Sequence, residues 1–300
     1  MLHVRSGIHG RDASDRLGRS EEQLGLRPET PTNLRIVVGW AGLPQVLRGA
    51  CVALGNFDGM HRAHQAVISS AAVAARLTER PLGVIRFDPH PVRVFRPDGP
   101  PFLLMTAGQQ ARVLQTLGVD VRYDLPFSAG LASLSEEAFC RDVLVGGLGI
   151  RHVSAGFDIR FGKNRSGDAD SLRRWGDRLG FGVAIVEAIT DEHGKISSSA
   201  VREALRRGDV GRANGLLGRP FAIEGRVVAA PTPSQTASVL FDDYLRPLPG
   251  LYKVRILTAA GMPVECAADV GRTSLVLNME TCDRDLRGQS VEIEFIGRLD

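Results

Sequence analysis

The sequence predicts an α/β protein in which a doubly wound parallel sheet is followed by a smaller all-β domain. Up to about residue 217, short apolar runs alternate with helical segments, a rhythm typical of a parallel sheet with helices on both faces. After Gly218-Arg219-Pro220, the apolar runs are separated by turns alone. The chain length of 300 residues agrees with two domains, because domains average roughly 150 residues.

The composition is that of an ordinary globular protein. Apolar residues make up 43% of the chain and charged residues 24%, and 37 basic and 34 acidic side chains leave a net charge of +3. This balance does not indicate nucleic-acid binding. No apolar run approaches the roughly 18 residues of a membrane-spanning helix, and the polar N-terminus lacks the apolar core of a secretory signal. We therefore expect a cytoplasmic protein with neither a membrane nor a nucleic acid as partner.

The four cysteines are far apart and form no CxxC pair. This spacing predicts neither a zinc site nor a disulfide framework, and it is typical of free thiols in a reducing compartment. The cysteines are Cys51, Cys140, Cys266 and Cys282.

The predicted elements of the first domain follow one another in a regular alternation. Residues 1–34 precede them and are polar without an apolar period, so we interpret them as a mobile extension or an incorrectly assigned start. The predicted strands are 34–38, 51–54, 82–87, 119–125, 153–156 and 183–186. The predicted helices are 63–77, 107–117, 135–144, 169–180 and 199–207. This order predicts a Rossmann-like domain over residues 35–217.

The last part of the chain, residues 218–300, contains almost no helical pattern. Its extended segments are predicted at 221–230, 251–258, 264–270, 273–279 and 289–296, with turns between them. Short strands at this spacing are typical of a small barrel.

The GNFDGMHRAH segment, residues 55–64, directly follows the strand predicted at 51–54. Its glycines let the backbone approach a phosphate closely, and the next helix offers unpaired N–H groups and a positive dipole end. His61 and His64 share one face of the first turn and could donate hydrogen bonds to a phosphate that gains charge in a transition state. A bare HxxH is more often two exposed histidines, but the glycine-rich lead-in after a strand favours a phosphate site.

The RFDPHP segment, residues 86–91, ends another predicted strand. Two prolines stiffen a loop at the carboxyl edge of the sheet, where α/β proteins bind ligands. Asp88 and His90 are therefore candidate ligand contacts. Taken alone, the segment could equally be a turn with a hydrated histidine.

The GFDIRFGKNRSGD segment, residues 156–168, combines glycines with clustered basic side chains. Such a loop suits anion binding, with Lys163 and Arg165 as the candidate contacts and Asp158 beside them. A solvated charged loop is the alternative interpretation.

The KISSSAVR segment, residues 195–202, opens a helix. Serines at a helix start cap it and can hydrogen-bond a phosphate, and Arg202 lies one turn further in, near the same end. An ordinary serine cap would be the simpler explanation if this segment stood alone.

Together, the order and spacing of these segments resemble the bacterial FAD synthetases, the bifunctional riboflavin kinase/FMN adenylyltransferase family. The resemblance covers residues 35–225 and includes GNFDGMHRAH, FDPHP, FDIRFGKNRSGD, ISSSAVREAL and the GDV…LLGRPF stretch. It implies a nucleotidyltransferase of the HxGH superfamily, which transfers AMP from ATP to FMN and gives FAD and pyrophosphate. The second domain would then be a riboflavin-kinase-like barrel. The substrates would be ATP and FMN, with Mg²⁺ as the expected metal.

The resemblance also implies roles for individual residues. His61 and His64 would bind the ATP phosphates and stabilise charge at the α-phosphate. Ser198, Ser199 and Arg202 would hold the β- and γ-phosphates. The other implied ATP or phosphate contacts are Gly55, Asn56, Phe57, Asp58, Gly59, Lys163 and Arg165. Asp58, Asp88, His90 and Asp158 are implied as weaker candidates for substrate or magnesium contacts, and the last three are the implied flavin contacts. No protein nucleophile is needed, because the phosphate of FMN attacks directly. Which of these residues would ligate the metal is not predicted.

One departure from the family pattern lies in the histidine motif, where the glycine of HxGH is Ala63. An added methyl group is harmless where φ is negative and space exists. We expect tolerance, because the other phosphate-binding segments are intact.

The second departure lies in the barrel. The glycine- and arginine-rich loop and the Pro-Thr-Ala-Asn motif of the family's kinase are absent after Val228. The family's kinase base lies nine residues before an Asp-Leu-aromatic-Gly motif, and counting back from Asp285 reaches Val276, which cannot accept a proton. We therefore predict a barrel that keeps its fold and has lost riboflavin kinase activity.

Three other functions stay open. The chain could be a true bifunctional enzyme, which the apolar residue at the base position speaks against. It could be a flavin- or nucleotide-binding regulatory protein without turnover, which the intact serine–arginine segment speaks against. It could also transfer a nucleotidyl group to a non-flavin phosphate, which the FDPHP and FDIRFGK segments speak against. The sequence does not predict the oligomeric state.

Overall fold

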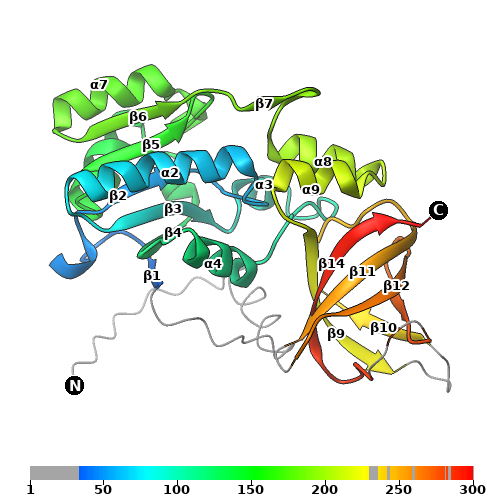
Figure 1. Cartoon of the computed structure of the whole chain (residues 1–300). Coiled ribbons are helices and arrows are strands. Elements are labelled where there is room, and N and C mark those ends of the chain that lie inside the picture. The colour runs from blue at the N-terminus through cyan, green and yellow to red at the C-terminus, as the bar shows by residue number, and fades with distance from the viewer. Residues whose placement is uncertain are drawn as a thin grey trace, which may run out of the picture.

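The computed structural model describes residues 34–229, 236–241, 244–258, 261–280, 282 and 285–299. Figure 1 shows an α/β domain beside a β-barrel, which confirms the predicted fold class. Apart from Leu34, the predicted N-terminal extension lies outside the described residues. Within the described part of the chain, none of the helices is long and apolar enough to cross a membrane.

Six parallel strands form the sheet of the α/β domain, in the order β1-β4-β3-β2-β5-β6. They are β1 (Arg35–Val38), β2 (Cys51–Leu54), β3 (Leu82–Asp88), β4 (Val121–Pro126), β5 (His152–Gly156) and β6 (Gly182–Val186). Leu54, the last residue of β2, pairs with Ile85 of β3 and with Ala155 of β5. The carboxyl ends of these three strands therefore meet at one edge.

Helices cover both faces of this sheet, with α2 and α4 on one face and η2 and α7 on the other. The helices that follow β1 along the chain are α2 (Arg62–Leu77), α3 (Pro91–Phe95), α4 (Ala107–Thr116), α5 (Ala129–Ala132), α6 (Glu136–Ala138), the π-helical η2 (Phe139–Gly147), α7 (Ala169–Leu179), α8 (Ser198–Arg206) and α9 (Val210–Leu217). Side chains of β2 alternate between the faces, as a strand's period of two requires. Cys51 and Ala53 pack with α2 and α4, whereas Val52 and Leu54 pack with η2 and α7.

Several short elements differ from the sequence prediction. The helix predicted at 135–144 begins at its Ser135 cap as α6, but it continues as η2 to Gly147. The structure adds α3, α5, α9, the hairpin of β7 (Thr190–Asp191) and β8 (Gly194–Lys195), and the 3₁₀ turns η1 (Gln45–Leu47) and η3 (Lys163–Arg165). Helix α9 was missed because Gly211 and Gly215 interrupt its apolar pattern, although Asp209 caps it and Gly218 ends it.

Six antiparallel strands close into the barrel, in the order β10-β13-β12-β11-β14-β9. They are β9 (Phe221–Ala229), β10 (Thr236–Leu240), β11 (Gly250–Thr258), β12 (Val264–Val270), β13 (Leu275–Asn278) and β14 (Ser290–Arg298). Five of them match the predicted extended segments, and β10 was not predicted. Residues 230–235, where the family's kinase motif is missing, lie outside the described residues.

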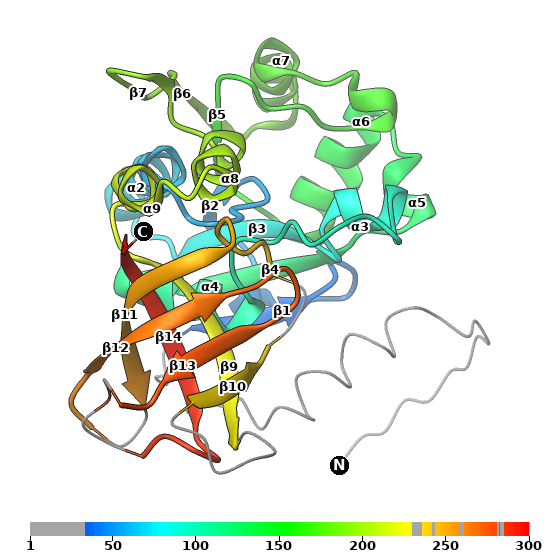
Figure 2. The same ribbon diagram turned by 90° about the vertical axis from the view of Figure 1, so that its right-hand side faces the viewer.

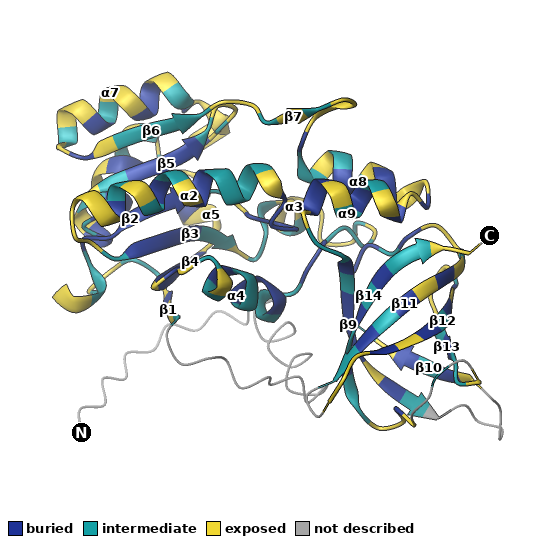
Figure 3. Cartoon of the chain, viewed as in Figure 1, coloured by how far each residue is buried: buried dark blue, intermediate teal, exposed yellow. Residues whose placement is uncertain are grey.

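Helices α8 and α9 share one hydrophobic core with the barrel. Val201 and Leu205 of α8 and Leu216 of α9 belong to the same buried cluster as Phe221 and Phe295 of the barrel. Figure 2 shows these helices stacked over the barrel, and Figure 3 shows their buried faces turned inward. The domain division between residues 217 and 218 stays a prediction, because this core spans it.

Candidate functional site

The candidate site lies where the direction of strand addition reverses. From β2 the chain builds β3 and β4 on one side, and it then returns to place β5 and β6 on the other. Ligands of open α/β sheets bind outside the carboxyl ends of the strands at such a point. The loop after β2, residues 55–60, and the segment after β5 both begin there.

The backbone of loop 55–60 is tightly curved. Phe57, Gly59 and Met60 have φ values of 54°, 81° and 48°, in the left-handed region. A Cβ on Gly59 would lie 2.7 Å from Cδ1 of Leu104, so only glycine fits there. The alternation of these conformations lets the chain turn sharply from β2 into α2.

Side chains from four elements hold the carbonyl groups of this loop. Gln110 of α4 donates to the carbonyl of Phe57 at 3.2 Å, and Ser198 of α8 donates to that of Asp58 at 2.9 Å. Arg219 donates to the carbonyl of Gly59 at 3.0 Å, and Gln65 of α2 donates to that of Met60 at 2.9 Å. The loop is therefore fixed before any ligand binds.

The two histidines of the motif stack on one another. Their ring centroids are 3.6 Å apart with an angle of 19° between the planes. His61 caps α2, and its Nδ1 accepts a hydrogen bond from the backbone N–H of His64 at 3.3 Å. Burial, reinforced by the charges of Lys195 and Arg202, lowers the pKa of His61 to about 4. Burial and the neighbouring His61 lower the pKa of His64 well below its usual value, so both rings are neutral at pH 7.

Ala63 lies in the first turn of α2 with a helical backbone. Its methyl group packs against the core that α8 and α9 share with the barrel. The alanine is therefore accommodated without the positive φ that would make it costly.

A buried ion pair fixes Arg202 at the centre of the site. Nη2 of Arg202 binds Oδ2 of Asp58, and its Nε donates to the carbonyl of Phe102 at 2.9 Å. The other carboxylate oxygen of Asp58 accepts from the backbone N–H of Leu104 at 2.9 Å. Burial raises the pKa of Asp58, and the charge of Arg202 opposes this shift. Asp58 thus orients Arg202, and both of its oxygens have protein partners.

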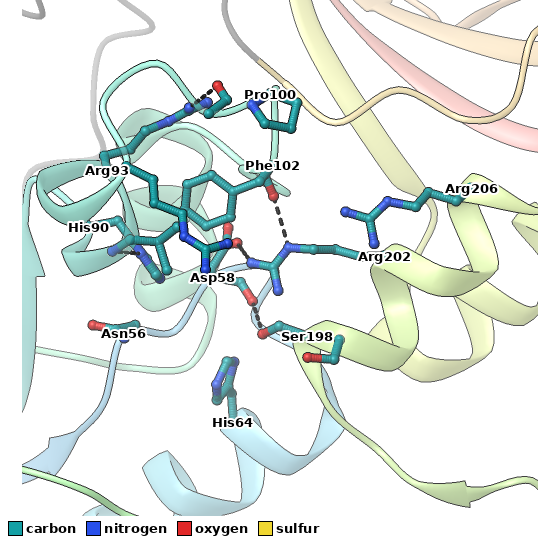
Figure 4. Close-up of a pocket in the computed structure, with 14 residues that line it drawn as sticks. Asn56, Asp58, His64, His90, Arg93, Pro100, Phe102, Ser198, Arg202 and Arg206 are labelled. Carbon is teal, nitrogen blue, oxygen red and sulfur yellow. Dashed lines mark hydrogen bonds and ion pairs between the residues drawn. The ribbon is translucent and has the colours of Figure 1, made fainter. Parts of the chain in front are cut away.

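A cavity of about 550 Å³ opens beside these groups. It contains seven of the residues predicted from the sequence, namely Asn56, Asp58, His64, His90, Ser198, Ser199 and Arg202. Figure 4 labels six of them, all but Ser199, and shows these six converging from the β2 loop, α2, α8 and the segment after β3. Nδ1 of His64 is buried and lacks a hydrogen-bond partner within the described residues.

The serines at the start of α8 have two roles: one caps the helix and two line the cavity. Ser197, which the sequence analysis did not single out, is the N-cap, and its hydroxyl accepts from the N–H of Ala200 at 3.2 Å. Ser198 and Ser199 are thereby left to line the cavity.

The segment after β3 contributes an aromatic wall. His90 caps α3, and its ring lies edge-on to Phe102 with centroids 4.9 Å apart. Burial, together with the charge of Arg202, lowers the pKa of His90 to about 4. Asp88 is exposed, lies 3.4 Å from Arg86 and does not line the cavity.

The segment after β5 stays outside the cavity. Asp158 is paired with Lys195 of β8, whose ammonium group lies 4.6 Å from the ring centroid of Phe157. Lys163 and Arg165 are exposed on η3. His61, Gly55, Phe57 and Gly59 lie in or beside the loop without lining the cavity.

Seven lining residues were not predicted from the sequence, and among them Arg93, Arg96, Phe102 and Arg206 carry the charged and aromatic side chains. The guanidinium carbons of Arg93 and Arg202 lie 5.0 and 5.1 Å from the centroid of the Phe102 ring. Arg202 and Arg206 are four residues apart in α8, which places them on one helical face, whereas Arg96 directly follows α3, the helix that contains Arg93. That spacing was the available signal, and with these arginines the cavity is strongly positive.

No cluster of three or more His, Cys, Asp or Glu side chains suited to a metal ion occurs among the described residues. Mg²⁺ commonly binds through substrate phosphates and one or two carboxylates rather than in an all-protein cage. Asp58 is the one carboxylate among the described residues that line the cavity, and both of its oxygens have protein partners, so a metal ion there would be held mainly through substrate phosphates.

Comparison with known proteins gives consistent matches. Residues 43–200 match the family model described as FAD synthetase. The chain is 31% identical over 274 residues to the bifunctional riboflavin kinase/FMN adenylyltransferase of Escherichia coli strain K12, covering 87% of this chain and 88% of the relative. It is 38% identical to the protein of the same name from Pseudomonas fluorescens, covering 74% of this chain and 73% of that one.

A solved structure also matches over most of the chain. It is that of a protein described as a macrolide-efflux protein from Streptococcus pneumoniae, with a TM-score of 0.80 and 27% identity. The match covers 89% of this chain and 91% of that one. The α/β domain and the barrel therefore occur together in another protein.

Proposed function

The chain belongs to the FAD synthetase family of nucleotidyltransferases, and from that premise we propose that its arginine-rich cavity transfers AMP from ATP to FMN. The observation that carries this proposal is the union of four guanidinium groups, the two serines of α8 and His64 around one cavity at the reversal point of the sheet. Positive groups and hydroxyl donors at a helix N-terminus suit a polyphosphate.

The reaction needs positioned charge rather than a protein nucleophile. A phosphate oxygen of FMN attacks the α-phosphorus of ATP, the new P–O bond completes FAD, and the bond to the β-phosphate breaks to release pyrophosphate. Arg202, Ser198 and Ser199 would hold the β- and γ-phosphates and so stabilise the leaving group. Mg²⁺, when bound to the phosphates, would neutralise part of their charge.

The histidines would act as neutral hydrogen-bond donors at the α-phosphate. Since Nδ1 of His61 accepts from the backbone, the proton of its neutral ring lies on Nε2 and can be donated there. The unpartnered nitrogen of His64 is available for a second contact. Such donors stabilise the charge that develops as the pentavalent arrangement forms.

The remaining assignments are graded by where the side chains lie. Asn56 and His90 line the cavity and are proposed as nucleotide or flavin contacts, while Gly55, Phe57 and Gly59 shape the loop. Asp58 is proposed as the residue that orients Arg202.

Asp88, Asp158, Lys163 and Arg165 lie outside the cavity and are proposed as contacts for parts of the substrates that extend beyond it. The cytoplasm is the proposed location.

We further propose that the barrel has lost riboflavin kinase activity. Val276, at the position of the kinase base, is an apolar residue of β13 that pairs with Ser238 and Asp269. None of its atoms can take a proton from riboflavin. The relatives named above are bifunctional, so this loss would distinguish the chain from them.

A paired turnover assay tests both parts. Purified protein, ATP and Mg²⁺ are incubated with FMN in one tube and riboflavin in another, and the flavins are separated by chromatography. We expect FAD from FMN and unchanged riboflavin. Conversion of riboflavin to FMN or FAD would overturn the loss of kinase activity. Saturable FMN binding without any product would indicate that the chain is a regulatory flavin-binding protein rather than an enzyme.

A variant pair assigns the reaction to the cavity. Arg202→Met should abolish FAD formation, because it removes the central cation. Arg178→Met is the control, since Arg178 is an exposed residue of α7 that lies over Trp175 and away from the cavity. Equal activity of the two variants would place the reaction elsewhere.

A further inference from the structure

We infer that Arg219 is a positioning residue that fixes loop 55–60 from the side of the barrel. Arg219 lies in the three-residue connection between α9 and β9, and its Nη1 donates to the carbonyl of Gly59 at 3.0 Å. The kinetic consequence rests on the proposed function, but the loop can be examined without turnover.

The C-terminal end of α9 packs closely against loop 55–60. A Cβ on Gly59 would lie 3.4 Å from Cδ2 of Leu217, so the loop backbone lies directly against the last residue of the helix. Nε2 of Gln65 donates to the carbonyls of both Met60 and Leu217, at 2.9 and 3.0 Å. Arg219 and Gln65 therefore tie two consecutive loop carbonyls to the same place.

Helix α9 is in turn hydrogen-bonded to the barrel. The side-chain oxygen of Asn214 in α9 accepts from the N–H of Phe221 in β9 at 2.7 Å, and its amide nitrogen donates to the carbonyl of Phe295 in β14 at 2.9 Å. Figure 1 shows α9 leading directly into β9. Arg219 lies between these attached elements, so its guanidinium is held relative to the barrel as well as to the loop.

The loop continues into the catalytic candidates. His61 follows Met60 directly and caps α2, and His64 stacks on it. Loss of the Arg219 donor would leave the buried Gly59 carbonyl without that hydrogen bond, which favours movement of the loop. Because displacement of reacting groups by about 1 Å can cost about 100-fold in rate, kcat should fall more than KM rises.

Arg112 offers a matched control from the same interface. It pairs with Glu224 and Glu292 of the barrel and makes no hydrogen bond or ion pair to loop 55–60 within the described part of the chain. Both arginines join the α/β domain to the barrel, but only Arg219 touches the loop. A merely structural role would give the two substitutions the same kinetic signature.

The experiment compares Arg219→Met, Arg219→Lys and Arg112→Met in the full-length protein. We measure kcat and KM for FAD formation, thermal stability, and hydrogen exchange of the amides in residues 55–61. Arg219→Met should lower kcat roughly tenfold or more and speed exchange in the loop. Arg219→Lys should restore part of both. Arg112→Met should lower the Tm and leave kcat within about twofold, with slow exchange retained in the loop.

Wild-type kcat and slow loop exchange in Arg219→Met would overturn the inference, as would equal effects of Arg219→Met and Arg112→Met on both. If Arg219→Met does not fold, Gln65→Met takes its place in the test. Faster hydrogen exchange in the loop would support the inference that contacts at the end of α9 fix the loop, and unchanged exchange would overturn it. If the wild-type protein makes no FAD, the proposed function fails by itself, and the exchange data still decide on Arg219.

Discussion

The pairing of Asp58 with Arg202 shows how a buried charge can be used to orient another. Asp58 is 5% exposed and gives one oxygen to Leu104 and the other to Arg202. A guanidinium held this way loses little freedom when a phosphate arrives, which favours binding in the geometry of the transition state. The carboxylate contributes through Arg202 rather than by touching the substrate.

Replacement of Asp58 by Asn tests this role. The amide keeps the size but places a neutral group against Arg202, and breaking a buried ion pair costs about 3–5 kcal/mol. We expect kcat/KM for FAD formation to fall at least about tenfold, which corresponds to about 1.4 kcal/mol. Asp191→Asn removes the carboxylate partner of Arg212 in a less buried ion pair outside the cavity and should leave kcat/KM unchanged. A similar loss in both variants would contradict the role of Asp58.

Ala63→Gly tests whether the departure from the family motif impairs the site. The methyl group has room and a helical backbone, and glycine in a helix costs about 1 kcal/mol relative to alanine. We therefore expect a less stable protein with kcat/KM changed by less than about tenfold, or about 1.4 kcal/mol. A gain beyond that factor would show that the alanine weakens catalysis.

The neutral histidines make stability depend on pH. The pKa of His61 is about 4 in the folded protein and about 6.5 when unfolded, so the unfolded chain binds the extra proton between these values. The free energy of unfolding is therefore highest above pH 6.5 and falls as the pH drops towards 4. His61→Asn, which keeps an N-cap acceptor, should show a shallower fall in denaturant titrations across this window. An unchanged slope would be inconsistent with a buried neutral ring.

At the scale of elements, the loop after β2 combines three left-handed residues with carbonyls held by side chains of α2, α4, α8 and the α9–β9 connection. Each tether comes from a different part of the chain, so local sequence alone cannot specify the conformation. The conformation of the loop therefore depends on the tertiary fold, which holds the start of α2 in a single orientation.

Gly59→Ala should be much more costly than Gly180→Ala. Both glycines are left-handed, with φ of 81° and 76°, and a side chain there costs about 1–2 kcal/mol. A Cβ at Gly59 would also press on Leu104, whereas nothing lies within 4 Å at Gly180. Crowding adds about 1–3 kcal/mol, so chemical denaturation should separate the two variants by that amount. Equal losses would mean that the loop can move away from Leu104.

The contrast between what the sequence predicted and what it missed has a physical cause. The strands β2 and β12 match their predicted bounds, because a short apolar run such as β2 and an alternation of buried and exposed residues such as β12 both report burial directly. His64, Ser198 and Arg202 were placed by motif and do meet at one cavity. Phe102 and Arg93 were missed because their role arises only when the segment after β3 folds back over α8, a contact distant in sequence.

At the scale of the whole molecule, a polar network and a common core join the two parts. Glu224 of β9 accepts from Thr106 at 2.6 Å and pairs with Arg112, while Gln109 donates to the carbonyl of Ala222 at 3.2 Å. The core that includes α8 and α9 continues into the barrel. Without the barrel, the apolar faces of α8 and α9 would therefore be exposed to solvent.

Truncation after residue 217 tests that dependence. The shortened chain would expose apolar side chains such as Leu205 and Leu216, which are fully buried in the whole protein. Large exposed apolar patches promote aggregation. We expect a product that aggregates or melts at a markedly lower temperature, as followed by circular dichroism and size-exclusion chromatography. A monomeric fragment with the full-length Tm would support residue 217 as an independent domain boundary.

The common core of α8, α9 and the barrel has a consequence for how such a chain can evolve. A barrel that no longer catalyses its own reaction could not simply be deleted, because the neighbouring helices would lose their covering. Substitutions would then accumulate on its outer positions, such as Val276, while inward positions such as Leu275 and Leu277 stay apolar. Selection for folding alone would preserve the architecture of a module long after its chemistry had gone.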